Sequence, residues 1–277
     1  MSQIVNIING IFSFLFTPLQ RLEPVWGLTI ISVLIGIAVL FVFRYTSNQR
    51  AIKISRNRIK AHILELLYYK DSIRVMVKAL LRILWQNTIY LRYALVPLII
   101  IIVPMILLFI QLDFRYQYRP LKTGETSIVK MRLSETPGNS ARINILPSDA
   151  IEVETPALRM DHNREFNWRI RAKKAGLHHI SFSMPGGGRI EKTIEIADHH
   201  TGLMPLSPRK VRGHFWDVLF NPVEKPLPSE NAVESVELMY PHRPLRIFGI
   251  RLNWLLFFFI ATMIVSFSLK NVVGVSF

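Results

Sequence analysis

The sequence contains no cysteine, and this absence removes several kinds of function at once. A chain without thiols forms no disulfide framework, holds no thiolate zinc site and offers no cysteine nucleophile. Acidic residues are also scarce, because 19 Asp and Glu stand against 34 Lys and Arg, which gives a formal net charge of +15. No nucleic-acid recognition motif accompanies this charge, so we expect no dedicated nucleic-acid site.

Charge is missing altogether from three long apolar runs, residues 24–43, 94–112 and 252–269. At about 1.5 Å of rise per residue, each of the first two runs covers roughly 30 Å as a helix, which is the thickness of a bilayer core. Half of all residues are hydrophobic and the mean hydropathy is +0.28, as in a membrane protein with a soluble part. Since ionisable residues mark proton and ion pathways, their absence from the runs disfavours a pump or proton-coupled carrier.

Positive charge is concentrated between the first two runs. Residues 44–93 hold eleven Lys or Arg but only two acids, Glu65 and Asp71. Short basic loops stay in the cytoplasm, whereas long domains cross the membrane regardless of charge. The sequence therefore predicts a multi-pass protein of a prokaryotic inner (plasma) membrane, with residues 44–93 and the C-terminus inside and the N-terminus outside. The inverted orientation is the alternative, and anionic lipids are the expected counter-surface of the basic loop.

The basic loop is predicted to form a helical hairpin. Apolar residues recur at helical spacing before residue 68, and Asp71 or Ser72 can cap a second helix from residue 73 to about residue 91. The second helix is basic and amphipathic, so it would lie at the membrane surface or pair with the first helix. A solvated connector is the alternative.

Further sequence features predict details of the membrane part. Residues 1–23 are expected to form an interfacial amphipathic helix, or alternatively a helix packed on the third run. Pro97 and Pro104 lie inside the second run and are expected to kink it. Mild polar residues in the third run, such as Thr262 and Ser266, are expected to make helix–helix hydrogen bonds. The third run and a short cytoplasmic tail complete the chain at residues 252–277.

Residues 113–251 change to short alternating apolar and polar runs. About seven such runs predict an extracytoplasmic all-β domain, a small Ig-like sandwich, with a hairpin between residues 180–184 and 190–196. The segment 201–232 is rich in proline and contains an aromatic stripe at helical spacing around Trp216. That stripe would lie on the outer leaflet or on the sandwich, and we favour a packing role.

Few residues suggest chemistry. His178-His179 point to opposite faces of a strand, and the spacing to His199-His200 matches no metal signature. The Gly186-Gly187-Gly188 run enters a strand and lacks the Lys-Ser/Thr of a phosphate-binding loop, so it is a turn. We therefore expect no enzyme activity, no metal and no cofactor.

The order of these features resembles the YidC/Oxa-type membrane insertase superfamily. The stretch LELLYYKDSIRVMVKALLRILWQNTIYLRYALVPLIIIIVPMILL, residues 64–108, is similar to the family's hairpin running into a membrane span. Lys70-Asp71 matches the turn of the family's pattern, residues 73–84 match its amphipathic helix, and Pro97 matches the proline of its membrane span. The likeness covers residues 24–112 and 252–269, about half of the chain.

The resemblance implies an insertase or membrane chaperone with three spanning helices, which receives client membrane proteins at its hairpin and inner-leaflet groove. The residues expected to contact a client or partner are Arg44, Asn48, Arg50, Arg74, Val77, Lys78, Arg82 and Trp85. The alternative is a structural or scaffold subunit of a stable envelope complex, in which the extracytoplasmic β-domain binds a partner protein or a polymer.

Overall fold

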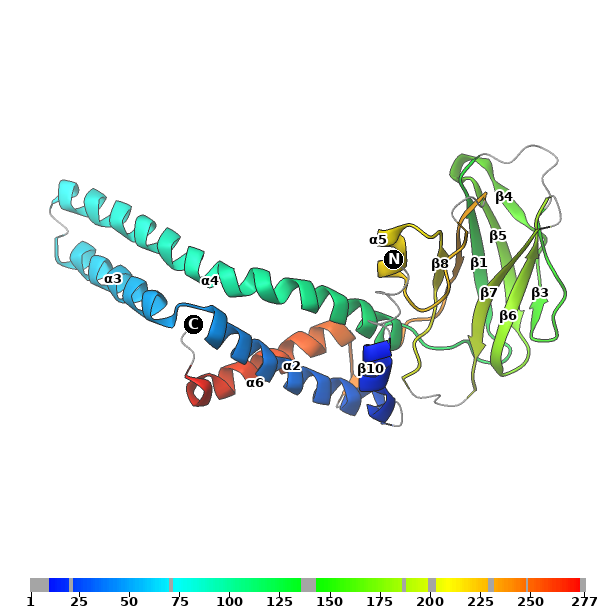
Figure 1. Ribbon diagram of the computed structural model, residues 1–277, viewed down its shortest axis with the longest axis horizontal. Coiled ribbons are helices and arrows are strands. Elements are labelled where there is room, and N and C mark those ends of the chain that lie inside the picture. Colours follow the sequence, from blue (N-terminus) through cyan, green and yellow to red (C-terminus); the bar gives the residue numbers. More distant parts are fainter. Residues whose placement is uncertain are drawn as a thin grey trace. The chain divides into compact units, whose positions relative to one another are not determined.

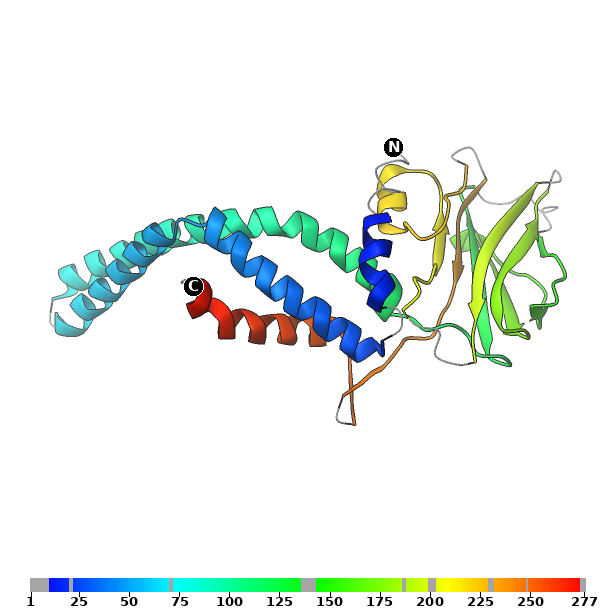
Figure 2. The same ribbon diagram turned by 60° about the horizontal axis from the view of Figure 1, so that its bottom comes forward.

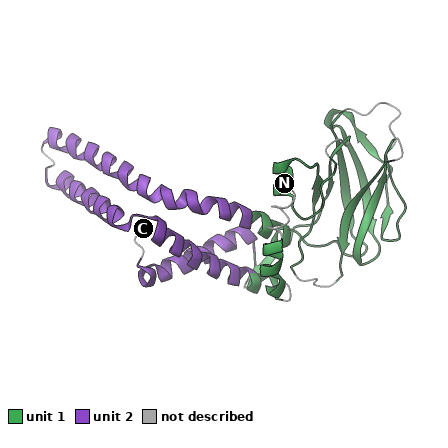
Figure 3. Ribbon diagram, viewed as in Figure 1, with its two compact units in different colours: residues 1–27, 109–251 green, residues 28–108, 252–277 purple. Residues whose placement is uncertain are grey.

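The computed structural model describes residues 10–19, 22–69, 72–135, 143–185, 188–198, 203–228, 232–247 and 249–274. The chain divides into two compact units, which Figure 3 shows in different colours. Unit 1 comprises residues 1–27 and 109–251, and unit 2 comprises residues 28–108 and 252–277.

Long helices make up unit 2, and two of them continue into unit 1 (Figure 1). They are α2 (Pro24–Thr46), α3 (Gln49–Tyr68), α4 (Ile73–Tyr116) and α6 (Trp254–Val273). Three of them, α2, α4 and α6, are long and apolar enough to cross a membrane, as the sequence predicted. The fourth, α3, carries the basic residues that follow α2 and is too polar to do so.

A side-chain cap separates α2 from α3. The Asn48 side-chain oxygen accepts a hydrogen bond from the Ala51 backbone N–H at 3.0 Å, which satisfies a donor that the first turn of α3 leaves free. At the other end of α3, Lys70 and Asp71 lie outside the described residues. The chain then turns back into α4, and an ion pair of 3.6 Å between Glu65 and Arg82 joins the two helices into a hairpin.

The predicted end of the second hairpin helix near residue 91 is wrong, because α4 continues without a break for 44 residues to Tyr116. No glycine or proline stands between residues 86 and 96, so nothing in the sequence stops the helix there. Pro97 and Pro104 both lie inside α4, where a break would expose further unpaired backbone groups to lipid. Figure 2 shows α4 following a curved path within unit 2, as interior prolines are expected to cause.

The strands of unit 1 form three sheets, and the paired strands of the two larger sheets are antiparallel. The largest sheet has the order β3-β5-β1-β9-β8, with β4 also paired to β5; its strands are β1 (Thr126–Leu133), β3 (Ile151–Val153), β4 (Leu158–Met160), β5 (Glu165–Ala172), β8 (Arg209–Val211) and β9 (Val233–Leu238). The second sheet consists of β2 (Asn144–Ile145), β6 (Gly176–Ser183) and β7 (Arg189–Ile196). A small third sheet pairs β10 (Leu245–Ile247) with β11 (Ile250–Leu252).

One apolar core joins the two larger sheets. Buried residues of both sheets belong to a single cluster, and Trp168 on β5 packs against Phe182 on β6 with ring centroids 5.5 Å apart. In β1, buried residues alternate with exposed or half-buried ones, as the sequence predicted for this strand. The predicted hairpin is also confirmed, because β6 pairs with β7 from Gly176 opposite Ile196 to Ser183 opposite Arg189.

Two shorter helical segments complete unit 1. Residues 10–16 are helical and lead into the 3-10 turn η1 (Thr17–Leu19), while residues 1–9 of the expected amphipathic helix lie outside the described residues. The aromatic stripe forms α5 (Phe215–Phe220), so its helical spacing is confirmed. The packing role that we favoured is wrong for Trp216, since 66% of this residue is exposed.

Candidate functional site

The basic hairpin of α3 and α4 exposes many apolar side chains. The hairpin apolar surface consists of Ile63, Leu64, Leu67, Ile73, Val77, Leu80, Leu81, Leu84 and Trp85, each at least 45% exposed. Contiguous apolar surface of this kind marks sites where soluble parts of proteins meet membranes or other proteins. The hairpin is therefore built to contact something apolar rather than to stand in water.

The predicted contact residues fall into two groups. The first surrounds the α2–α3 junction and consists of Arg44, Asn48 and Arg50. The second lies on the first turns of α4 and consists of Arg74, Val77, Lys78, Arg82 and Trp85. Arg82 pairs with Glu65, which stands about 22 Å along α3 from Arg50, so much of α3 separates the two groups. The structure thus does not gather all eight residues into one site.

Within the second group, charge and apolar surface follow separate lines along α4. Arg74, Lys78 and Arg82 are each four residues apart, so they share one face of the helix. Val77 and Trp85 belong to the hairpin apolar surface instead. This arrangement combines a cationic stripe with an apolar one, which suits the boundary between lipid headgroups and acyl chains.

Asn48 and Arg82 have structural tasks that the sequence did not reveal. The Asn48 side chain caps α3, and the Arg82 guanidinium pairs with Glu65 across the hairpin. These two interactions engage polar atoms of residues that we expected to contact a client. Both residues therefore help to set the shape of the hairpin.

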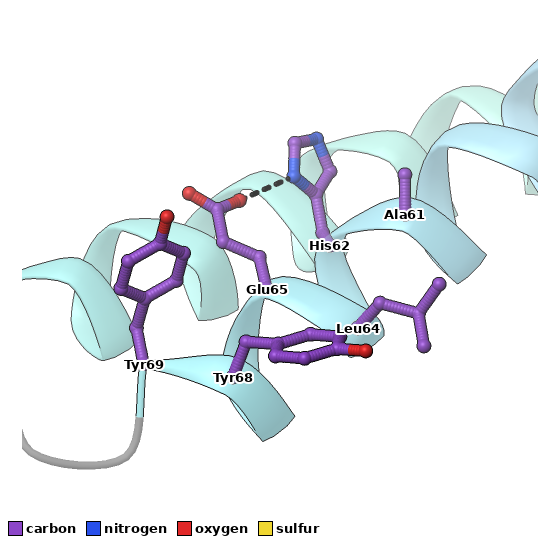
Figure 4. A pocket seen from close by; sticks show the side chains of 6 residues that line it. All are labelled: Ala61, His62, Leu64, Glu65, Tyr68 and Tyr69. Atoms are coloured by element: carbon purple, nitrogen blue, oxygen red, sulfur yellow. Dashed lines mark hydrogen bonds and ion pairs between the residues drawn. The ribbon is translucent and has the colours of Figure 1, made fainter.

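A hollow near the tip of the hairpin was not expected from the sequence. Figure 4 shows the side chains that line it: Ala61, His62, Leu64, Glu65, Tyr68 and Tyr69. His62 Nδ1 lies 2.9 Å from Glu65 Oε2, and the other carboxylate oxygen of Glu65 is the one that pairs with Arg82. Glu65 thus has two partners, and its ion pair with Arg82 links α3 to α4 beside the hollow. The sequence feature that could have indicated this hollow is Glu65, the one acid of a basic helix, followed by Tyr68 and Tyr69.

The two prolines of α4 change the polarity of its apolar half. Proline has no backbone N–H, so Pro97 and Pro104 leave the carbonyl groups of Tyr93 and Ile100 without the usual helical donor. The prolines are seven residues apart and so lie close to one face of the helix. Around them, apolar side chains such as Ile99 and Val103 are more than 60% exposed. In this helix, these backbone carbonyls add polarity to a span whose side chains from residue 94 to residue 112 carry no charge.

Small residues let α2 and α6 approach closely. A Cβ atom added at Gly36 would lie 3.0 Å from Val265 Cγ1, so no larger residue fits there without movement. The hydroxyls of Thr262 and Ser266 donate to the Ser32 and Gly36 carbonyl oxygens, at 3.5 and 3.4 Å. These contacts confirm the predicted helix–helix hydrogen bonds and form a small-residue seam.

Unit 1 contains a buried ionic cluster. Lys192 on β7 is fully buried, and its ammonium donates to Glu224 Oε2 at 2.6 Å and to the Ser207 backbone oxygen at 2.6 Å. Burial lowers the pKa of Lys192, and the Glu224 carboxylate opposes that shift. Burial alone would raise the pKa of Glu224, but Lys192 and the hydrogen bonds of the cluster hold it below its usual range. The cluster ties the proline-rich segment to β7 and offers no accessible reactive group.

Among the described residues, no group of three or more His, Asp or Glu side chains is placed to hold a metal ion. His178 Nε2 lies 3.0 Å from the Lys174 carbonyl oxygen, so this ring has a local partner. His199 and His200 lie outside the described residues. The sequence-based expectation of a protein without metal or cofactor stays a prediction.

Comparison with known proteins found no matching family model, no matching curated protein and no matching solved structure.

Proposed function

We propose that this protein is an insertase or membrane chaperone of the YidC/Oxa type, which assists the insertion or assembly of client membrane proteins. One observation carries the proposal. A basic hairpin that exposes apolar side chains is continuous, through α4, with a proline-containing helix long enough to span the bilayer.

The length of α4 links the two parts. Its 44 residues extend about 66 Å, roughly twice the thickness of a bilayer core, so a large part of the helix must stand outside the lipid. A client segment that meets Val77 and Trp85 on the hairpin can follow the same helix toward the exposed apolar side chains beside Pro97 and Pro104. The carbonyl groups left free by the prolines give passing polar groups a partner inside the membrane.

The proposed mechanism needs no nucleotide. Burying apolar surface gains about 25 cal/mol per Å², so a client helix that moves from water into lipid supplies its own driving force. The hairpin would hold the segment before that step and shield it from water. The cationic stripe of Arg74, Lys78 and Arg82 would keep the hairpin close to anionic headgroups.

Site-specific photocrosslinking in living cells tests the proposal. A photoreactive amino acid replaces Val77, which is 48% exposed on the hairpin, and in a separate strain Leu177, which is 66% exposed on β6. We expect position 77 to give many short-lived adducts with newly made membrane proteins, and position 177 to give none of them. Loss of the position-77 adducts when translation is blocked would identify them as nascent clients. A single adduct that persists without translation would contradict the insertase proposal.

The alternative function is that of a scaffold subunit, and the sheet edges of unit 1 favour it. We propose that the two larger sheets form an Ig-like sandwich, since they share one core and consist of short antiparallel strands. The outer strand β8 is partly covered, because the Leu227 backbone N–H donates to the Val211 carbonyl oxygen at 2.8 Å. A partner strand would therefore pair with the other outer strand of this sheet, β3, which is three residues long. One discrete adduct at position 177, unchanged when translation stops, would support this function instead.

A further inference from the structure

The helix α5 carries an exposed aromatic group that neither proposed function explains. Trp216 is 66% exposed and Phe220 is 49% exposed, and their rings are stacked with centroids 6.5 Å apart. Phe215 contacts Trp216 edge to face at 5.2 Å. We call Phe215, Trp216 and Phe220 the aromatic cap. Exposed apolar patches of this kind mark sites where a protein contacts a membrane or another protein.

The segment that holds the cap is bonded to the point where the chain leaves a spanning helix. The Leu206 backbone N–H donates to the Phe114 carbonyl oxygen at 2.9 Å, and Phe114 belongs to the last turns of α4. Leu203 of the same segment lies at the start of α2, because a Cβ added at Gly27 would come 3.0 Å from Leu203 Cδ1 and 2.8 Å from Tyr116 Oη. Two apolar helices thus meet within unit 1 beside the proline-rich segment.

A second apolar segment of unit 1 is tied to the same point. The Arg115 guanidinium lies 4.3 Å from the centroid of the Phe16 ring and is itself buried by its contacts with Gln111. This contact holds the helix of residues 10–16 against the end of α4. On that helix, Phe14 is 82% exposed and Ile11 is 55% exposed. The described segment from residue 10 to residue 19 carries no charge.

Figures 1 and 2 place these features at one end of unit 1. The helix of residues 10–16 and α5 lie at the end that contains residues 109–116, whereas β3 lies at the opposite end. Residues 109–116 are the last turns of α4, one of the helices that are long and apolar enough to cross a membrane. That end of unit 1 is therefore the one that the chain connects to a candidate membrane span.

We propose that the aromatic cap is a lipid-contact site, which docks unit 1 on the surface of the membrane that α4 crosses. Tryptophan and phenylalanine are the side chains best suited to the headgroup boundary, where a ring gains apolar contacts and an indole N–H keeps a polar partner. The exposed residues Ile11 and Phe14 extend the same contact. The docking would hold the β-domain close to the bilayer whether the protein acts as an insertase or as a scaffold.

The absence of cysteine makes a direct test possible, because each single-cysteine variant carries one thiol. W216C and L177C place that thiol on residues of equal exposure, 66% each, in α5 and in β6. The full-length variants are labelled with an environment-sensitive fluorophore and reconstituted into vesicles of phosphatidylcholine and phosphatidylglycerol. A fraction of the lipid carries a nitroxide near the headgroup, which quenches only fluorophores that touch the membrane.

We expect the lipid nitroxide to quench the label at position 216 about twofold or more relative to the label at position 177. F220C provides a second label on the cap and should behave like W216C, which guards against a local defect in one variant. Equal quenching at positions 216 and 177 would overturn the proposal. So would a label at 216 that is shielded from aqueous iodide but not quenched by lipid, because protein would then cover the cap.

Discussion

At the residue scale, the most deeply buried ion pair among the described residues of unit 1 joins Lys192 and Glu224. Lys192 is fully buried and the Glu224 side chain is 9% exposed, so each charge has given up most of its water. Ser207 adds a hydroxyl that donates to Glu224 at 2.9 Å, and Lys210 lies 3.4 Å from the other carboxylate oxygen. A pair enclosed in this way is costly to break, because removal of one partner leaves a buried charge alone.

Glu224→Ala is expected to destabilise the β-domain by about 3–5 kcal/mol, since it leaves Lys192 buried without its counter-charge. Lys192→Met/Glu224→Leu removes both charges and is expected to recover much of that loss. Thermal unfolding of the full chain, followed by the loss of β-sheet signal in circular dichroism, measures both variants. A double variant as unstable as Glu224→Ala would show that packing around these side chains, and not charge, sets the cost.

The same pair predicts a pH dependence with a definite sign. The pKa of Glu224 is lowered in the folded protein, so its carboxylate contributes stability above the ordinary glutamate pKa of about 4.3. That contribution is lost as the pH falls through the lower folded value. Glu224→Gln cannot titrate, so the stability difference between the wild type and this variant should shrink as the pH falls below about 4. A difference that stays constant across this range would contradict the assignment.

At the element scale, the seam between α2 and α6 depends on a side chain that is missing. Gly36→Leu would force a bulky residue into a position where even an added Cβ would lie 3.0 Å from Val265, so the helices should separate. Ala38→Leu adds similar bulk at an exposed position of α2 and is the matched control. Oxidative crosslinking of a Ser32→Cys/Thr262→Cys pair reports the contact. Crosslinking should be lost with Gly36→Leu and kept with Ala38→Leu; equal loss in both would mean that bulk anywhere on α2 disturbs it.

Element boundaries show where reasoning from the sequence succeeded and where it failed. The apolar runs and the alternation in β1 were visible because burial repeats with a fixed period over many residues. Strands β4, β8, β10 and β11 are three residues long, and a pattern of that length cannot be told from a loop. The α4 boundary failed for a different reason: the sequence changes from basic and amphipathic to uniformly apolar after Arg92, but a change of polarity does not end a helix when no glycine or proline stands there.

The candidate site was predictable in its composition but not in its contacts. The hairpin residues from Arg74 to Trp85 were recognisable as basic and amphipathic from their spacing alone. The pairing of Glu65 with both His62 and Arg82 depends on how α3 and α4 align, which no local pattern specifies. The exposure of Trp216 could not be predicted from the sequence either, because an aromatic stripe has the same spacing whether it packs inward or faces outward.

At the scale of the whole molecule, the uneven distribution of charge predicts the orientation of the chain. Residues 44–93 carry nine net positive charges, whereas residues 113–251 carry 21 Lys and Arg against 16 Asp and Glu. Moving nine charges outward against a potential of about 100 mV would cost about 20 kcal/mol. The longer domain carries a smaller net charge, and long domains cross with little regard to charge.

Single-cysteine labelling in intact cells tests this orientation. Tyr68→Cys lies on the hairpin at 84% exposure, and Leu177→Cys lies on the β-domain at 66% exposure. A membrane-impermeant maleimide should label position 177 in intact cells and position 68 only after the cells are permeabilised, because the basic hairpin stays inside. The reverse pattern would establish the inverted orientation. It would also place the hairpin apolar surface away from newly made chains, so that the insertase proposal would fall together with the predicted topology.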